Sequence, residues 1–304
     1  MRLCIAVVDV LSVLTGVMAM PNSAHCRSRA GATPRRRLES GHLPPSRYRT
    51  SPPSSMPLSR TVTPVTPQAL PAGLDAIFVI HATGFVERRK FIEAQMAGLG
   101  LPFEFVLDFD IPAIPESLRQ QLFRGDKLSP AQQSCALKHW QAHRLIAQRQ
   151  LSRALILEDD VIFADGFWPA LNGLMKEELA LGDPHVTFLG CGGHYYVPHD
   201  QIRAGQWLYP RNQGKFADSY IVSQATVQRR LDWIEANGIT LPIDHTFEHI
   251  DRTLATPMFW LEPPVVEQGS HNGKFSSALD KSHPLWFQAL QFRWKKLWRR
   301  RRHE

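Results

Sequence analysis

Short apolar runs recur along the chain between residues 76 and 223, and polar residues follow each of them. Ala76–Ile80 is a continuous apolar run, which is typical of a parallel strand that is buried on both faces. Further apolar runs predict more strands, at residues 103–107, 154–157, 185–189 and 219–223.

Amphipathic stretches separate the first of these strands. Residues 87–99 have helical character, and Gly100 follows them as a helix stop. Ser129-Pro130-Ala131-Gln132 is a capping box with proline at the first helical position, and it predicts a helix that runs to about residue 150. Because strands alternate with helices, the sequence predicts an α/β fold with a mainly parallel sheet.

The N-terminal part of the chain has a different composition. Ten of the 23 prolines lie between Pro21 and Pro71, among many serines, threonines and arginines. This composition predicts a disordered leader over residues 1–71. Within it, residues 3–20 are mostly apolar but contain Asp9, so they are a signal peptide, a membrane anchor or neither. An over-long gene start is a further alternative, with Met56 as the true first residue.

The C-terminal part, residues 278–304, is predicted to be a basic amphipathic tail. In residues 286–304, tryptophan, phenylalanine and leucine recur at helical spacing and alternate with lysine and arginine. A helix of this kind suits an anionic membrane surface, so we expect a cytoplasmic protein that is held peripherally on the inner membrane. The alternative is a helix that packs on its own domain and ends in a solvated basic segment.

Charge and cysteine content exclude several classes of protein. Residues 1–60 carry nine arginines against two acids, and residues 286–304 carry seven basic residues against one acid. The part between them has 19 basic and 25 acidic residues, so the predicted fold is acidic and no nucleic-acid partner is expected. The four cysteines form no CxxC pair, which fits a reducing compartment better than a disulfide scaffold.

Three adjacent carboxylates follow the apolar run at 154–157, namely Glu158, Asp159 and Asp160. If the strand continues through them, Glu158 and Asp160 point to the same face. Ligands bind at the carboxyl ends of strands in open α/β sheets, and paired carboxylates there can hold Mn²⁺ or Mg²⁺ against a diphosphate. The alternative is a solvated acidic turn after a core strand.

The chain resembles glycosyltransferase family 25, which includes bacterial lipooligosaccharide galactosyltransferases and procollagen galactosyltransferases. Order and spacing agree over residues 75–277, within a predicted domain at 72–277. The blocks that carry the resemblance are Val79-Ile80-His81 with residues 87–92, Leu128-Ser129-Pro130 with residues 135–139, residues 155–163, and residues 219–223 with Pro242-Ile243-Asp244-His245.

The sequence departs from the family pattern at a few positions. His81 stands where the family usually has Asn or Ser, and Gln132 replaces a Glu. Lys138 replaces the Ser before His139, and Asp218 stands where a His is common. The carboxylate triplet is intact, so these departures bear on the identity of the donor and acceptor more than on catalysis.

The resemblance implies a GT-A-like nucleotide-sugar-binding fold and transfer of a hexose, such as galactose from UDP-galactose, with inversion. The acceptor is expected to be a glycan or glycolipid, such as bacterial lipopolysaccharide. Asp160, with Glu158 or Asp159, would bind the divalent cation that neutralises the departing diphosphate. Arg88 would pair with a donor phosphate or brace the nucleotide loop.

Other residues are candidates for binding and proton transfer. Asp108 and Asp110 end a predicted strand and can accept hydrogen bonds from the uracil or ribose, while Gln268 is expected to close the donor site. Asp244 is the candidate general base for the acceptor hydroxyl. His139 is expected to orient the carboxylates.

Three alternatives to these assignments stay open, one for the helix residues and two for the whole protein. Cys135, His139 and His143 share a helical face, but spacing alone rarely makes a metal site, and a diphosphate favours oxygen ligands. The protein as a whole is alternatively a metal-dependent phosphohydrolase or a non-catalytic scaffold or adhesion protein.

Overall fold

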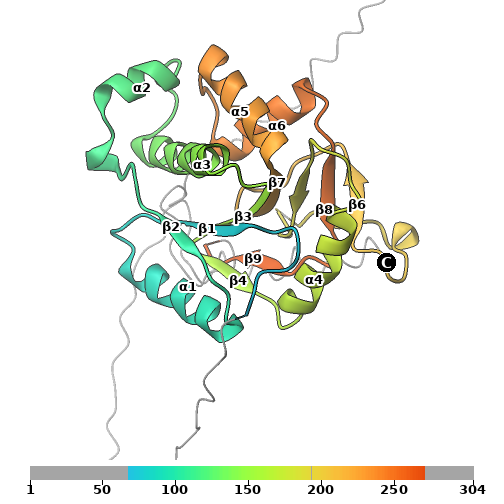
Figure 1. Ribbon diagram of the computed structural model, residues 1–304. Coiled ribbons are helices and arrows are strands. Elements are labelled where there is room, and N and C mark those ends of the chain that lie inside the picture. Colours follow the sequence, from blue (N-terminus) through green and yellow to red (C-terminus); the bar gives the residue numbers. More distant parts are fainter. Residues whose placement is uncertain (1–67, 193, 271–304) are drawn as a thin grey trace, which may run out of the picture. The chain divides into compact units, whose positions relative to one another are not determined.

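The computed structural model describes residues 68–192 and 194–270 (Figure 1). The apolar run at 3–20, the predicted basic tail at 278–304 and all but the last four residues of the predicted leader lie outside these described residues. Within the described residues, no helix is both long and apolar enough to cross a membrane.

A seven-stranded sheet forms the centre of the described domain, with the strand order β2-β1-β3-β7-β5-β8-β6. Five strands run in one direction, because only β7 and β6 are antiparallel to their neighbours. The predicted α/β fold with a mainly parallel sheet is therefore confirmed. The strands are β1 (Ala76–Ile80), β2 (Glu104–Val106), β3 (Arg153–Glu158), β5 (Val186–Phe188), β6 (Leu208–Arg211), β7 (Ser219–Ser223) and β8 (Met258–Leu261).

Helices cover both faces of this sheet (Figure 1). One face packs against α3, α5 and α6, and the other packs against α1 and α4. A small antiparallel sheet of β4 (Val161–Phe163) and β9 (Val266–Gln268) lies beside the larger one. The helices are α1 (Val86–Leu99), α2 (Glu116–Leu122), α3 (Pro130–Gln148), α4 (Phe167–Glu178), α5 (Gln224–Asn237) and α6 (Ile243–Thr253), with single 3₁₀ turns at Ile111–Ala113 and His199–Gln201.

The middle of β3 is apolar because both of its faces are buried. In β3, Ala154 and Ile156 pack into the core under α3, while Leu155 and Leu157 pack into the core under α1 and α4. All four side chains are fully buried. This arrangement fixes the position of the residue that ends the strand, Glu158, at the rim of the sheet.

Local signals define the helices next to this rim. The Ser129 hydroxyl accepts from the backbone N–H of Gln132, whose side chain accepts from the N–H of Ser129, so the predicted capping box starts α3. Gly100 ends α1 in the left-handed conformation, with φ of 66°. The start of α3 is therefore set by its sequence, and with it the register of the side chains on its inner face.

Candidate active site

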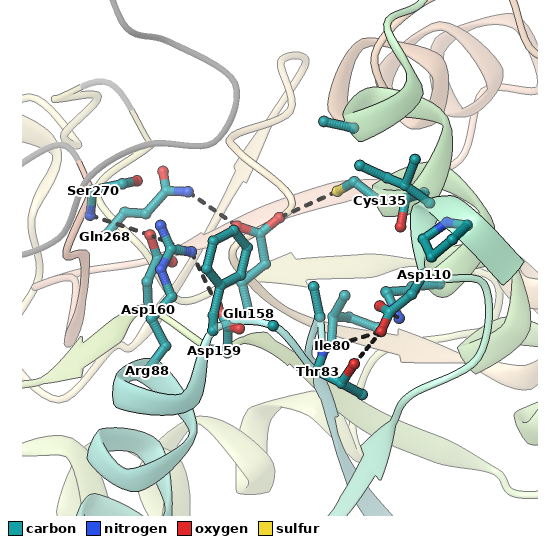
Figure 2. A pocket seen from close by; sticks show the side chains of 18 residues that line it. Ile80, Thr83, Arg88, Asp110, Cys135, Glu158, Asp159, Asp160, Gln268 and Ser270 are labelled. Carbon is teal, nitrogen blue, oxygen red and sulfur yellow. Dashed lines mark hydrogen bonds and ion pairs between the residues drawn. The ribbon is translucent and has the colours of Figure 1, made fainter.

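The carboxyl ends of β1, β2 and β3 meet at one edge of the sheet, and a cavity of about 430 Å³ opens there (Figure 2). The β1–α1 loop, the loop after β2, the first half of α3, the end of β3 and the end of β9 form its walls. The lining residues are Ile80, Ala82, Thr83, Gly84, Phe85, Arg88, Asp110, Ile111, Pro112, Ala131, Ser134, Cys135, Lys138, Glu158, Asp159, Asp160, Gln268 and Ser270.

The three adjacent carboxylates all line this cavity, but they do not share a strand. β3 ends at Glu158, and Asp159 and Asp160 form the turn into β4. The prediction that Glu158 and Asp160 point to one face assumed that the strand continues to Asp160. This is wrong, because the strand ends at Glu158. Arg88 lies close to the carboxylates of both Asp159 and Asp160, and their other partners differ.

Asp159 is held by two basic side chains. Its Oδ2 lies 2.6 Å from Nδ1 of His81, and its Oδ1 accepts from the guanidinium of Arg88 at 3.1 Å. His81 is buried and Arg88 is largely buried. Both carboxylate oxygens of Asp159 thus have a protein partner. Through this contact Arg88 braces the segment Glu158-Asp159-Asp160, which is called the carboxylate turn below.

Asp160 is almost fully buried, with 1% of its surface exposed. Its Oδ2 accepts from the backbone N–H of Ser270 at 3.1 Å and lies 3.6 Å from the guanidinium of Arg88. Its Oδ1 is buried and has no hydrogen-bond partner among the described residues. Burial, with the charge of Glu158 next in importance, raises the pKa of Asp160 to about 6.

Glu158 faces α3 with one oxygen and β9 with the other (Figure 2). Its Oε2 accepts from Nε2 of Gln268 at 3.0 Å, and its Oε1 lies 3.5 Å from Nε2 of His139 and 3.8 Å from Sγ of Cys135. Burial and the charge of Glu158 hold the pKa of the Cys135 thiol well above its usual value. His139 contacts Glu158, and its role in orienting the carboxylates stays a prediction.

Asp110 lies at the opposite wall, in a polar cluster of its own. Its Oδ1 is 2.9 Å from Nζ of Lys138, and its Oδ2 accepts from the hydroxyl and the backbone N–H of Thr83. Lys138 also donates to the backbone carbonyl of Asp108 at 2.7 Å. The Asp108 side chain is exposed and is not part of the cavity wall. Of the two predicted nucleotide-binding acids, only Asp110 faces the cavity.

A second, smaller cavity of about 130 Å³ adjoins the first. Cys135, Glu158 and Gln268 line both cavities, so they form the partition between them. Asp244, at the start of α6, lines only the smaller one. The structure thus places the candidate base in one cavity and Asp159 and Asp160 in the other, with Glu158 lining both.

Asp218 also lines the smaller cavity and is fully enclosed by protein. Burial, followed by the charge of Glu158, raises its pKa to about 8, and the pKa of nearby Lys215 is lowered to about 8, mainly by burial. The backbone carbonyl of Asp218 accepts from the N–H of Glu158 at 2.8 Å. Asp218, one of the residues that depart from the family pattern, is therefore packed directly against the end of β3.

We expect Asp218→Asn to flatten the dependence of stability on pH. A carboxyl whose pKa rises from 3.8 to about 8 on folding stabilises the native state fully below pH 3.8 and loses that contribution as the pH approaches 8. Asn cannot ionise, so the variant should gain stability relative to the wild type as the pH rises. Urea midpoints at pH 5, 7 and 8.5 measure this, with exposed Asp232→Asn as the control. Urea midpoints that change equally with pH in Asp218→Asn and in the wild type would contradict this expectation.

Two residues that depart from the family pattern contact the acids of the site, which the sequence alone does not indicate. His81 and Lys138 each replace a smaller polar residue, and each pairs with an acid at the cavity, Asp159 and Asp110. Ser270, which binds Asp160 through its backbone, carries no sequence signal because any residue offers the same N–H.

Comparison with known proteins identifies one family whose model matches part of the chain. Residues 74–201 match the model of glycosyltransferase family 25, described as an LPS biosynthesis protein. This part of the chain is therefore similar to glycosyltransferase family 25. The match covers β1, the carboxylate turn and the α3 residues that face it, and it places the protein among the glycosyltransferases. No curated protein sequence matches the chain.

Three solved structures are similar to part of the chain at low identity. A glycosyltransferase involved in the glycosylation of the major capsid of PBCV-1 is 12% identical, with a TM-score of 0.29, and the match covers 58% of this chain and 75% of that one. Mouse xyloside xylosyltransferase 1 is also 12% identical, with a TM-score of 0.34 and coverage of 60% and 83%. A197 from STIV is 11% identical, with a TM-score of 0.30 and coverage of 62% and 82%. The assignment to the glycosyltransferases rests on the family match and not on these similarities.

Proposed function

We propose that the protein transfers a hexose, galactose from UDP-galactose, to a lipopolysaccharide or lipooligosaccharide acceptor with inversion at the anomeric carbon. The observation that carries this proposal is the carboxylate turn Glu158-Asp159-Asp160 at the wall of a 430 Å³ cavity, within the part of the chain that is similar to family 25. The cavity is at the carboxyl edge of β1, β2 and β3, where open α/β sheets bind nucleotides. The description of the family as an LPS biosynthesis protein supports the acceptor class.

The residues of the turn fit a hard divalent cation such as Mn²⁺ or Mg²⁺. Asp160 offers a buried oxygen that lacks a hydrogen-bond partner among the described residues, and burial raises the pKa of its carboxyl to about 6. Both oxygens of Asp159 are held by the basic side chains of His81 and Arg88, whereas Glu158 lines both cavities, so we assign the ligand role to Asp160 with Glu158. A cation bound there supplies positive charge against the diphosphate leaving group.

The adjoining cavities suggest how the substrates are arranged. The larger one takes the nucleotide sugar, with Asp110 beside the nucleoside and Arg88 holding the carboxylate turn. The smaller one takes the acceptor sugar, next to Asp244. Glu158 and Gln268 line both, so the reacting atoms would meet there.

Within this arrangement the acceptor hydroxyl oxygen attacks the anomeric carbon and forms the new glycosidic bond. The bond from that carbon to the diphosphate oxygen breaks, and its electrons leave with the nucleoside diphosphate. Asp244 accepts the proton of the attacking hydroxyl. His139 acts on Glu158 and serves as a positioning residue, because it does not line either cavity.

A screen of UDP-sugars for nucleotide release tests this proposal. We expect release from UDP-galactose in the presence of acceptor and Mn²⁺, and loss of release in EDTA that added Mn²⁺ restores. Product analysis by NMR reports the anomeric configuration. Release that is unaffected by EDTA would remove the cation from the proposal, and the absence of release from every UDP-sugar tested would contradict the proposed donor class.

We further propose peripheral attachment to the inner membrane through residues 286–304, which lie outside the described residues. Seven basic residues contribute about 1 kcal/mol each near an anionic surface. Deleting residues 286–304 is expected to release the protein from anionic liposomes in a sedimentation assay, and high salt is expected to act in the same way. Binding that resists both treatments would point to residues 3–20 instead.

A further inference from the structure

Two side chains on the inner face of α3 converge on Glu158. Cys135 and His139 are one helical turn apart, and the capping box at Ser129 sets the register that turns them toward the end of β3. Sγ of Cys135 lies 3.8 Å, and Nε2 of His139 lies 3.5 Å, from Oε1 of Glu158. All three atoms lie within 4.8 Å of one another. Cys135 and His139 make no metal site by their helical spacing alone. The structure adds a third donor, Glu158, from the end of β3.

We propose that Cys135, His139 and Glu158 bind a transition-metal ion of the zinc class. Thiolate, imidazole and carboxylate are the donors that zinc takes, whereas Mg²⁺ and Mn²⁺ prefer oxygen. Bond lengths of about 2.0–2.3 Å in a tetrahedral site place neighbouring donor atoms about 3.3–3.6 Å apart. The two separations from Glu158, 3.5 and 3.8 Å, are close to that range, and all three donors lie within 4.8 Å of one another, so binding one ion requires the donors to move closer together.

The groups around these donors also suit a metal site. Nδ1 of His139 lies 3.1 Å from the hydroxyl of Tyr220, which lies 3.2 Å from Nε2 of His143. In one tautomer, the Nδ1–H of His139 donates to the Tyr220 hydroxyl, which donates to Nε2 of His143. The Nε2 lone pair of His139 is then directed toward Glu158, and metal-bound histidines commonly have such a hydrogen-bond partner on the other ring nitrogen. Oε2 of Glu158 is held by Gln268 at 3.0 Å, which orients the carboxylate.

Three protein donors leave one position of a tetrahedral ion open. Cys135 and Glu158 line both cavities, so this position is accessible to water or to a substrate oxygen. Three donors with an open fourth position are the pattern of a catalytic rather than a structural zinc site. This site shares Glu158 with the cation site proposed at Asp160 but differs from it in every other ligand.

Cobalt substitution tests this site without any assay of transfer, so its failure and the failure of the proposed function are distinguishable. The full chain is stripped with EDTA, desalted and titrated with Co²⁺ while the absorption spectrum is recorded. We expect a near-ultraviolet band from thiolate-to-cobalt charge transfer, intense visible bands of a tetrahedral ion, and displacement of both by one equivalent of Zn²⁺.

Variants identify the donors. Cys135→Ser is expected to abolish the charge-transfer band, while Cys191→Ser, at the other cysteine among the described residues, should retain it. Asp160→Asn should also retain it, because Asp160 is not a donor in this site. Tyr220→Phe should keep the spectrum but weaken Co²⁺ affinity by about 10-fold or more.

The proposal is overturned if the wild type shows no charge-transfer band. It is also overturned if the band persists in Cys135→Ser, since the thiolate would then come from another cysteine. Circular dichroism checks the fold of each variant. If Cys135→Ser does not fold, His139→Gln is used in its place. The proposal is overturned if His139→Gln keeps the tetrahedral visible bands and binds Co²⁺ with unchanged affinity.

Discussion

Asp160→Asn is expected to lower kcat/KM for sugar transfer by about 10²–10³-fold while leaving the protein folded. The substitution keeps the shape of the side chain and removes the charge that we assign to cation binding. Asp160 has a pKa raised to about 6, chiefly by burial, so its ionised form is unfavourable in the cation-free protein. Thermal stability at pH 7.5 without added metal should therefore hold or rise. Steady-state kinetics with UDP-galactose and thermal denaturation measure the two effects.

Neighbouring substitutions separate a catalytic effect from a structural one. Asp159→Asn removes the partner of buried His81 and of Arg88, so it is expected to lower the melting temperature, unlike Asp160→Asn. Asp200→Asn, at an exposed acid away from both cavities, serves as the charge control. Near-normal Mn²⁺-dependent transfer by Asp160→Asn would refute the assigned role. Unfolding of both Asp159→Asn and Asp160→Asn would make the carboxylate turn structural.

The fold near the site is well predicted from the sequence because its signals are local. The apolar run at 76–80 corresponds to β1 without error, and the capping box at Ser129 starts α3 as expected. The run at 154–157 lies within β3, which is one residue longer at each end. Each of these elements is defined by burial or by a cap that its own residues specify.

The elements that complete the site were not predicted, because they depend on contacts that are distant in the sequence. β4 and β9 have three residues each and pair across about a hundred positions, so neither gives a recognisable periodicity. Their pairing places Gln268 against Glu158 and brings the backbone of Ser270 to Asp160.

The geometry of the carboxylates was missed for a related reason. An apolar run followed by acids does not show where a strand ends, and β3 ends at Glu158. The two later acids lie in a turn, where the alternation of side chains no longer applies. Their partners, His81 and Arg88, come from the loop and helix after β1.

Asp244→Asn is expected to lower kcat for transfer by about 10²–10⁴-fold, the range that a general base contributes. Asp244 lines the smaller cavity, at the start of α6, whereas Asp110 and Arg88 line the larger one. A base is required only when an acceptor hydroxyl attacks, whereas the charge on the leaving group develops with any nucleophile. Because Asp244 does not line the cavity assigned to the donor, the variant should still bind the donor with a nearly unchanged KM.

The control for this variant is Glu248→Gln, one turn further along α6, which makes the same change of charge outside both cavities. We expect Glu248→Gln to transfer at a near-normal rate. Slow hydrolysis of UDP-galactose without acceptor gives a second readout, because water as nucleophile does not depend on a base placed for the acceptor sugar. Asp244→Asn should largely retain this hydrolysis, and Asp160→Asn should lose it together with transfer. If Asp244→Asn transfers normally, or if it loses hydrolysis and transfer in equal proportion, Asp244 is not the base for the acceptor.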